Sequence, residues 1–309
     1  MRRAERCGGK LMMASKMIHG RPLCFSTFHA DVGADGSEQG PHPKANLANL
    51  RYVRNIELLF RSVNVFHPHS RLSLLTSART DLTALKVRYL RLDSRIDAKA
   101  LMLSRSLAQQ HMVHNNDFSL PIVLIDSDIL LNGSLESVFE QDFDVALTWR
   151  KSVNMPINGG LLILNNRRPD VVRKFFDDFV AIYREKYIDG AGWYGDQLAL
   201  RDVCCVTYRE MRDRKLIEIN GCKILFLPCD RYNFTPEDSF AAVMAPISNA
   251  VVLHFKGYRK RFMEAYWLAH LQLRERSSML RRLNAHLMQK SLARKAKREV
   301  ISVGNNEDE

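Results

Sequence analysis

The chain contains no uninterrupted apolar run of the roughly 18 residues that a membrane-spanning helix requires. The longest apolar stretch near its start, LMMASKMIHG, is short and contains Lys16, so we expect neither a signal sequence nor a membrane anchor. The 6 cysteines include no C-x-x-C pair and no histidine at zinc-finger spacing, which argues against a structural zinc site. The apolar neighbours of Cys24 and Cys205 predict buried thiols, and we expect a protein of the reducing cytoplasm.

Basic residues outnumber acidic ones, and most of the excess lies near the two ends of the chain. The 309 residues carry a net charge of +12, of which residues 1–20 contribute +4 and residues 271–300 contribute +7. The last nine residues contribute −3, which leaves +4 for residues 21–270. With 46% hydrophobic residues, this central region can bury a full core. Because this region is nearly neutral, it does not have the basic surface that a nucleic-acid-binding domain requires.

Strands and helices alternate along the central region. A helix is expected from about residue 46, because apolar side chains recur at spacings of three and four, and a second helix is expected at 98–114. Short apolar runs bounded by turn residues predict the strands. This order, in which we expect no tight hairpin, predicts an open α/β sheet with its ligand at the carboxyl ends of the strands. The helix stripe consists of Leu50, Val53, Ile56, Leu59, Phe60 and Val63, and the strands are expected at 21–30, 71–77, 86–93, 121–126, 144–149 and 159–165.

An Asp-x-Asp motif, Asp126-Ser127-Asp128, follows the most apolar of these strands. Two carboxylates at a strand terminus in a solvent-facing crevice can both bind one hard cation such as Mg²⁺ or Mn²⁺. Such a motif occurs about once by chance in a chain of this composition, so its position in the fold decides its meaning. A second copy, Asp142-Phe143-Asp144, precedes a strand, and we interpret it as a turn and the start of that strand.

A second polar segment, HFKGYRKRF, follows another apolar strand and begins with His254. Imidazole is a good ligand for Mn²⁺, so His254 could complete a metal site with Asp126 and Asp128. The backbone N–H of Gly257 can approach a phosphate closely, and Lys260 can neutralise its charge. The segment also contains Lys256, Arg259 and Arg261. Together the two segments predict a site for a metal ion and a diphosphate.

Four motifs resemble, in the same order, those of the GT-A fold nucleotide-diphospho-sugar glycosyltransferases, most closely family 8, the glycogenin and lipooligosaccharide galactosyltransferase type. They are Asp126-Ser127-Asp128, the run INGGLLILN that contains Asn158, Gly159 and Gly160, the pair Asp196-Gln197, and His254-Phe255-x-Gly257-x-x-Lys260. The chain departs from the family pattern where Arg261-Phe262 follows Lys260 in place of Pro-Trp, and where Leu198-Ala199 follows the Asp-Gln pair.

The resemblance implies a single catalytic domain with a Rossmann-like mixed sheet that moves a sugar, with retention, from a UDP-hexose to a glycan, lipid-linked or protein acceptor, using Mn²⁺ or Mg²⁺. Metal binding would fall to Asp126, Asp128 and His254, and catalytic contacts to Asn158, Asp196 and Gln197. The donor-binding residues implied are Phe28, Arg105, Asp126, Ser127, Gly159, Gly160, Gly257 and Lys260.

Two other classes of protein remain as alternatives. A sugar nucleotidyltransferase also uses paired aspartates, but its glycine-rich basic loop after the first strand is missing from FSTFHADVGADG. A nucleic-acid-binding protein would explain the pI of about 9.5, although the near-neutral centre argues against it.

The basic ends predict a domain organisation. We expect a basic leader at 1–20, a GT-A domain at 21–265, a basic amphipathic helical tail at 266–300 and an acidic end at 301–309. The leucines of the tail recur at helical spacing among many arginines and lysines. Such a segment either attaches the enzyme peripherally to an anionic membrane surface or packs on the core with its charges solvated.

Overall fold

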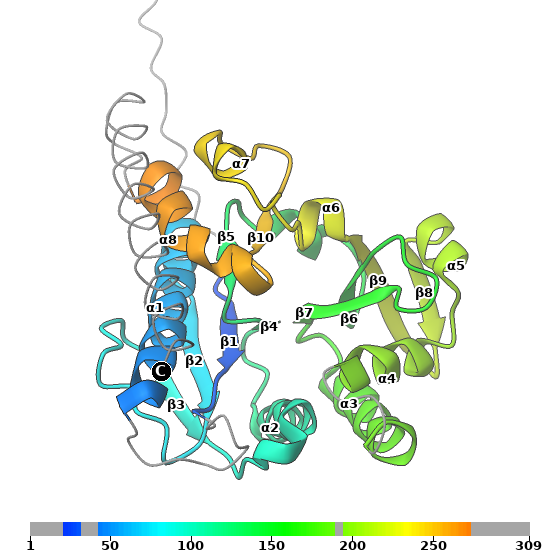
Figure 1. Cartoon of the computed structure of the whole chain (residues 1–309). Helices are drawn as coiled ribbons and strands as arrows, with labels where there is room; N and C mark the ends of the chain where they lie inside the picture. Colours follow the sequence, from blue (N-terminus) through cyan, green and yellow to red (C-terminus); the bar gives the residue numbers. More distant parts are fainter. Residues whose placement is uncertain (1–20, 32–42, 189–193, 273–309) are drawn as a thin grey trace, which may run out of the picture.

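The computed structural model describes residues 21–31, 43–188 and 194–272, which form an α/β fold around a mixed sheet of eight strands (Figure 1). The strand order is β3-β2-β1-β4-β7-β6-β9-β8. The β3, β2, β1 and β4 neighbours pair in parallel, as do β6 and β9, whereas β7 is antiparallel to both β4 and β6, and β8 is antiparallel to β9. The predicted α/β class with a mixed sheet is therefore confirmed. The strands are β1 (Cys24–Phe28), β2 (Arg71–Thr76), β3 (Leu90–Asp93), β4 (Ile122–Ile125), β6 (Val145–Trp149), β7 (Ile157–Leu164), β8 (Leu216–Ile219) and β9 (Cys222–Pro228).

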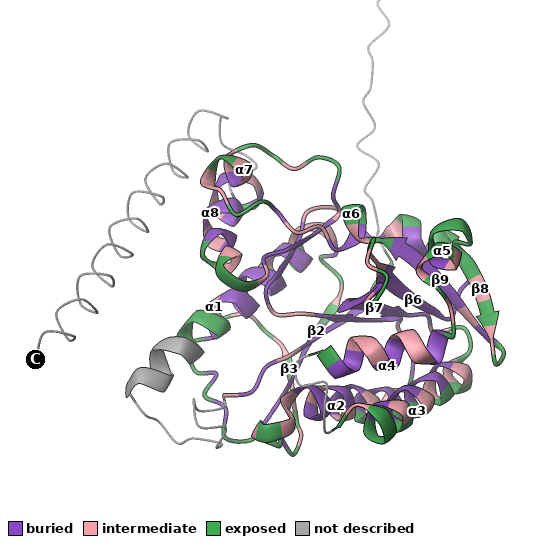
Figure 2. Ribbon diagram, turned by 45° about the vertical axis from the view of Figure 1, so that its right-hand side comes forward, coloured by how far each residue is buried: buried purple, intermediate pink, exposed green. Residues whose placement is uncertain are grey.

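Helices cover both faces of the sheet. On one face, α2 (Leu101–Asn115), α3 (Pro169–Lys186) and α4 (Gly195–Cys204) lie together with their buried sides toward the strands (Figure 2). The long helix α1 (Pro43–Phe66) packs on the other face with the later part of the chain. Each face has its own buried apolar cluster, so the central strands β4 and β7 are buried throughout. This explains their continuous apolar sequences, IVLI and INGGLLIL. The shorter helices are α5 (Tyr208–Asp213), α6 (Cys229–Tyr232), α7 (Phe240–Met244) and α8 (Met263–Tyr266).

A small second sheet brings two distant segments together. In it β5 (Ile129–Leu131), which begins directly after Asp128, pairs antiparallel with β10 (Val252–His254), so that His254 faces Ile129. The N–H of Phe255 donates to the carbonyl oxygen of Asp128 at 2.8 Å. The two polar segments that the sequence analysis singled out are thereby placed next to each other.

Several expectations about the fold are wrong in detail. Leu50, expected in the buried stripe of α1, is 50% exposed, while the other stripe residues are buried. The expectation that the chain has no tight hairpin is wrong. Strands β8 and β9 are joined by Asn220-Gly221, and both residues have the positive φ that a two-residue hairpin turn requires. Cys205, which was expected to be buried, is exposed at the C-terminal end of α4, whereas Cys24 is buried as expected. The five cysteines of the described segments are free.

The expected tail begins inside the core. Tyr266 and the turn 267–271 belong to the buried apolar cluster on the α1 face, with Trp267 and Leu271 nearly inaccessible. The leader 1–20 and the tail from residue 273 lie outside the described residues, so the proposed domain boundaries and the membrane attachment stay predictions. None of the described helices is both long and apolar enough to cross a membrane.

A buried histidine predicts acid sensitivity. His67 follows α1, and its Nε2 accepts the N–H of Leu135 at 3.1 Å. Burial lowers the pKa of His67 from 6.5 to about 4. The unfolded chain therefore binds a proton between these two values and the folded chain does not, so stability is complete above about pH 6.5 and is lost as the pH falls toward 4. We expect the free energy of unfolding, measured in urea, to be roughly 2–3 kcal/mol lower at pH 4.5 than at pH 7.5 through this group.

The variant His67→Gln isolates that contribution, because glutamine can still accept from Leu135 but does not titrate. Its loss of stability between pH 7.5 and 4.5 should be smaller than that of the parent. Equal losses in the two proteins would show that protonation of His67 does not govern acid unfolding.

Candidate functional site

Two aspartates and one histidine form an acidic cluster at the carboxyl end of β4. Nε2 of His254 lies 3.0 Å from Oδ1 of Asp128 and 3.6 Å from Oδ2 of Asp126. One ligand atom from each of the three residues lies within 4.8 Å of the others. Two carboxylate oxygens and an imidazole nitrogen are suitable ligands for Mn²⁺ and related divalent ions. The donor set therefore fits the metal ion that the resemblance implies.

Asp128 is less open than the sequence analysis expected. Its side chain is 11% exposed and is paired with both His254 and Lys260, whose Nζ lies 3.3 Å from Oδ2. Burial raises the pKa of Asp128, but the charges and hydrogen bonds of His254 and Lys260 outweigh burial and hold it well below 3.8. Asp128 is therefore an ionised, largely buried carboxylate and not a group in a solvent-facing crevice.

Arg105 links the acidic cluster to the Asp-Gln pair. Its Nη1 donates to Oδ1 of Asp126 at 2.6 Å, and its Nη2 is paired with Oδ2 of Asp196. The Arg105 side chain is 11% exposed and that of Asp196 only 3%, and Oδ1 of Asp196 has no hydrogen-bond partner within the described part of the chain. Burial raises the pKa of Asp196, and the nearby Arg105 opposes that rise. Arg105 thus joins residues from α2, the end of β4 and α4 in one buried ion network.

The two glycines of β7 lie against this network. A β-carbon on Gly160 would stand 2.6 Å from Cε1 of His254 and 3.0 Å from Oδ2 of Asp126, and one on Gly159 would stand 3.1 Å from Oδ2 of Asp196. The carbonyl oxygen of Gly160 also accepts the N–H of Asp126 at 2.9 Å. Glycine is therefore required at residue 160 by close approach to the acidic cluster, not by its backbone conformation.

This close approach predicts a sharp difference between two glycine variants. Gly160→Ala should fold but lose Mn²⁺ binding at least tenfold, because the new methyl group displaces His254 or Asp126. Gly133→Ala should bind Mn²⁺ as the parent does, since its β-carbon would meet only Val251, at an ordinary 3.6 Å. Titration calorimetry measures both affinities. Unchanged affinity in Gly160→Ala would mean that the cation does not bind among these side chains.

The basic segment after β10 is divided between two roles. Lys260 faces the acidic cluster, and its Nζ also lies 4.8 Å from the ring centroid of Tyr52 on α1. Arg259 and Arg261 turn away from it, because they bind the carbonyl oxygen of Pro236 and the carboxylate of Asp238. Neither arginine therefore adds its charge to the metal and diphosphate site that the sequence predicts. Gly257 has a φ of +58°, a conformation that favours glycine.

The remaining predicted residues surround the same centre less closely. Asn158 is buried in β7, and Gln197 accepts from Nη2 of Arg150 at 3.3 Å. Ser127 lies between the two aspartates. Phe28 ends β1, beside β4, and packs with the apolar cluster on the α2 face. The structure thus brings the metal and catalytic candidates together and gives Phe28 a packing role.

Asn233, Thr148 and Arg150 were missed by the sequence analysis. Asn233 and Thr148 are buried beside the cluster, and Arg150 contacts Gln197. No motif contains them, so only the tertiary structure could show their proximity. The second Asp-x-Asp copy is confirmed as structural: Asp142 is exposed, and Asp144 pairs with Arg168 where β6 begins.

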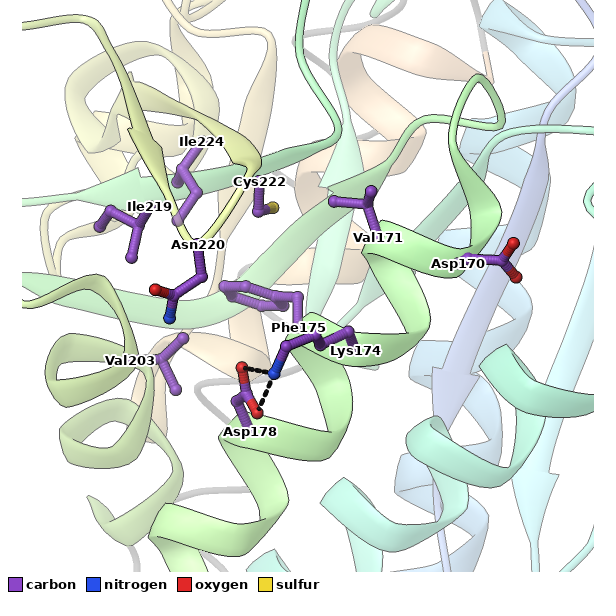
Figure 3. A pocket seen from close by; sticks show the side chains of 10 residues that line it. All are labelled: Asp170, Val171, Lys174, Phe175, Asp178, Val203, Ile219, Asn220, Cys222 and Ile224. Atoms are coloured by element: carbon purple, nitrogen blue, oxygen red, sulfur yellow. Dashed lines mark hydrogen bonds and ion pairs between the residues drawn. The ribbon is translucent and has the colours of Figure 1, made fainter.

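Two cavities of the described chain lie elsewhere. One, of about 240 Å³, is mostly apolar and lies between α3, α4 and the β8–β9 hairpin, with the ion pair of Lys174 and Asp178 at its side (Figure 3). The other, of about 830 Å³, lies between the edge strand β3 and the end of α2. Neither is lined by the acidic cluster.

No protein-family model matches the chain, and no curated protein matches it in sequence. Several solved structures resemble it at 12–15% sequence identity. The bifunctional glycosyltransferase WbbM has a TM-score of 0.48 over 81% of this chain and 49% of its own. The glycosyltransferase GlyE of Streptococcus pneumoniae has a TM-score of 0.45 over 88% of this chain and 64% of its own. The galactosyltransferase LgtC, solved with donor and acceptor sugar analogues, has a TM-score of 0.46 over 85% of this chain and 95% of its own.

The chain therefore spans about half the length of WbbM and 64% of GlyE. The function of this chain has to follow from its own residues.

Proposed function

We propose that this chain is a metal-dependent glycosyltransferase of the GT-A type, which transfers a hexose from a UDP-sugar to a glycan, lipid-linked or protein acceptor. The observation that carries the proposal is the acidic cluster of Asp126, Asp128 and His254. It lies at the carboxyl end of a central strand, where open α/β sheets bind ligands. A diphosphate needs both a cation and basic side chains, and Lys260 and Arg105 flank the cluster.

The leaving diphosphate gains negative charge as the bond between the anomeric carbon and oxygen breaks. A divalent cation held by the acidic cluster would supply part of the stabilising charge, and Mn²⁺ suits the imidazole ligand better than Mg²⁺ does. Lys260 would supply a further positive charge, its Nζ moving from Asp128 to a phosphate oxygen. Gly257, with an unobstructed backbone, would let a phosphate approach its N–H.

The sugar would bind on the side of Asp196. The unpaired Oδ1 of Asp196 is an acceptor for a sugar hydroxyl, whereas the space over Gly159 and Gly160 is occupied by Asp196, Arg105 and His254. Asn158 and Gln197 complete the group of polar side chains. With Oδ2 of Asp196 held by Arg105 and Oδ1 directed at the donor sugar, neither oxygen is left to deprotonate an acceptor, which supports retention over inversion.

A thermal-shift screen tests the proposal. We expect UDP or a UDP-hexose together with Mn²⁺ to raise the melting temperature by several degrees, since a ligand at 100 times its Kd stabilises the folded state by about 2.7 kcal/mol. Mn²⁺ with GDP, CDP or dTDP compounds should give smaller shifts. Stabilisation by DNA or RNA but not by UDP would overturn the proposal, and pyrophosphate release from UTP and a sugar phosphate would indicate a nucleotidyltransferase.

A further inference from the structure

The ring of His254 is held at its second nitrogen by a buried asparagine. Nδ1 of His254 lies 2.7 Å from Oδ1 of Asn233, which follows α6 and is only 1% exposed. The other ring nitrogen, Nε2, faces Asp126 and Asp128. The imidazole is therefore held by protein groups at both ring nitrogens, and the identity of the group at Nδ1 decides which nitrogen carries a proton.

A threonine fixes which way the amide of Asn233 points. The hydroxyl of Thr148 donates its proton to the carbonyl oxygen of Asn158 at 2.8 Å. Its oxygen is then an acceptor, and it receives the Nδ2 hydrogen of Asn233 at 2.8 Å. With Nδ2 directed at Thr148, the amide oxygen must face the ring, so Nδ1 of His254 has to be the donor. Thr148 is fully buried, so water does not compete for these bonds.

An irregularity in the sheet places Thr148 there. The register of β6 against β7 shifts between Leu147 and Thr148, so that Leu147 pairs with Leu162 but Thr148 pairs with Asn158. Such a bulge redirects a side chain. The side-chain oxygen of Asn158 in turn accepts the N–H of Gly160 at 3.1 Å, so the same hydrogen-bond chain reaches the glycine that lies against the acidic cluster.

We propose that Asn233 and Thr148 are positioning residues that keep His254 protonated at Nδ1, with the Nε2 lone pair directed at the position a cation would share with Asp126 and Asp128. A histidine that binds a metal commonly donates its other N–H to a protein oxygen, and this bond sets the tautomer and ring orientation. With the opposite amide orientation, Nδ1 would accept from Nδ2 and Nε2 would carry a hydrogen toward the carboxylates, which blocks the cation. This inference rests on the proposed metal site.

Two readouts other than enzymatic activity test it. With Zn²⁺ bound, a diamagnetic ion that also takes imidazole ligands, long-range ¹H–¹⁵N spectra of ¹⁵N-histidine-labelled protein at pH 8 should show His254 protonated at Nδ1 and not at Nε2, the signal being assigned by its loss in His254→Gln. In Asn233→Ala the proton of His254 should no longer be restricted to Nδ1. The Mn²⁺ affinity measured by calorimetry should fall about 10- to 100-fold, the usual effect of removing the hydrogen-bond partner of a metal-binding histidine. Thr148→Val should weaken Mn²⁺ binding, while Thr148→Ser, which keeps the hydroxyl, should restore it.

Asn132→Ala is the matched control. Asn132 lies directly after β5, and its amide binds the carbonyl oxygens of Ile247 and Ala250 without contacting His254, so this variant should lose stability but keep the parent's Mn²⁺ affinity. If Asn233→Ala keeps the Mn²⁺ affinity and the His254 spectrum of the parent, this inference is wrong, but the proposed function is not affected. A parent protein that does not bind Mn²⁺ would contradict the proposed function as well. If Asn233→Ala does not fold, Thr148→Val and Thr148→Ser give the same test.

Discussion

Replacing Asp128 by asparagine should nearly abolish sugar transfer in a protein that still folds. The change removes one anionic ligand from the acidic cluster, and a bound cation supplies several kcal/mol of transition-state stabilisation. If about 4 kcal/mol of this transition-state stabilisation is lost, the rate of sugar transfer falls roughly 10³-fold. The measurement is UDP release from the donor selected by the thermal-shift screen, with Mn²⁺ present. We also expect about 1–3 kcal/mol of lost stability, because Asp128 is buried and bonded to His254 and Lys260.

Asp144→Asn provides the control for this experiment. Asp144 is also a buried carboxylate, and its partners are Arg168 and the N–H of Lys223. Its substitution should destabilise the protein without slowing transfer by the folded fraction. Transfer by Asp128→Asn in EDTA at the rate of the parent would refute a metal-dependent reaction.

Substituting Arg105 by methionine should cause the largest loss of stability. The substitution leaves Asp196 buried without its counter-ion and leaves it near a second carboxylate, Asp126. Breaking a buried ion pair on one side costs about 3–5 kcal/mol. Urea unfolding at pH 7 measures this loss. The double variant Arg105→Met, Asp196→Asn should recover most of it, because no buried charge then remains unpaired at that position.

Arg167→Met tests whether the effect depends on burial. Arg167 pairs with Asp142 at 2.8 Å, but both side chains are at least half exposed. An exposed ion pair contributes less than about 1 kcal/mol, so this variant should be nearly as stable as the parent. A similarly small loss in Arg105→Met would show that Asp196 is neutral or solvated in the folded protein.

The sequence by itself determined the central strands and the chemistry of the site. Continuous apolar runs predicted the central strands β4 and β7, because strands covered on both faces have no polar side to expose. The carboxylates of Asp126 and Asp128 and the imidazole of His254 could be identified as potential ligands, because ligand chemistry is a property of the residue type. The dipeptide Asn220-Gly221 is typical of a two-residue hairpin turn, so the β8–β9 hairpin could also have been predicted from the sequence.

Only the tertiary structure decided which of these groups meet. The pairing of β5 with β10 brings Asp128 to His254, although the two residues lie far apart along the chain, and the fold buries Arg105 between Asp126 and Asp196. It also turns Arg259 and Arg261 away from the cluster, although their charges suggested an anion site. Asn233 and Thr148 carry no motif, since an amide and a hydroxyl become positioning groups only when other buried atoms fix the direction of their hydrogen bonds. Residue types define the available chemistry, but distances and burial depend on contacts between distant segments.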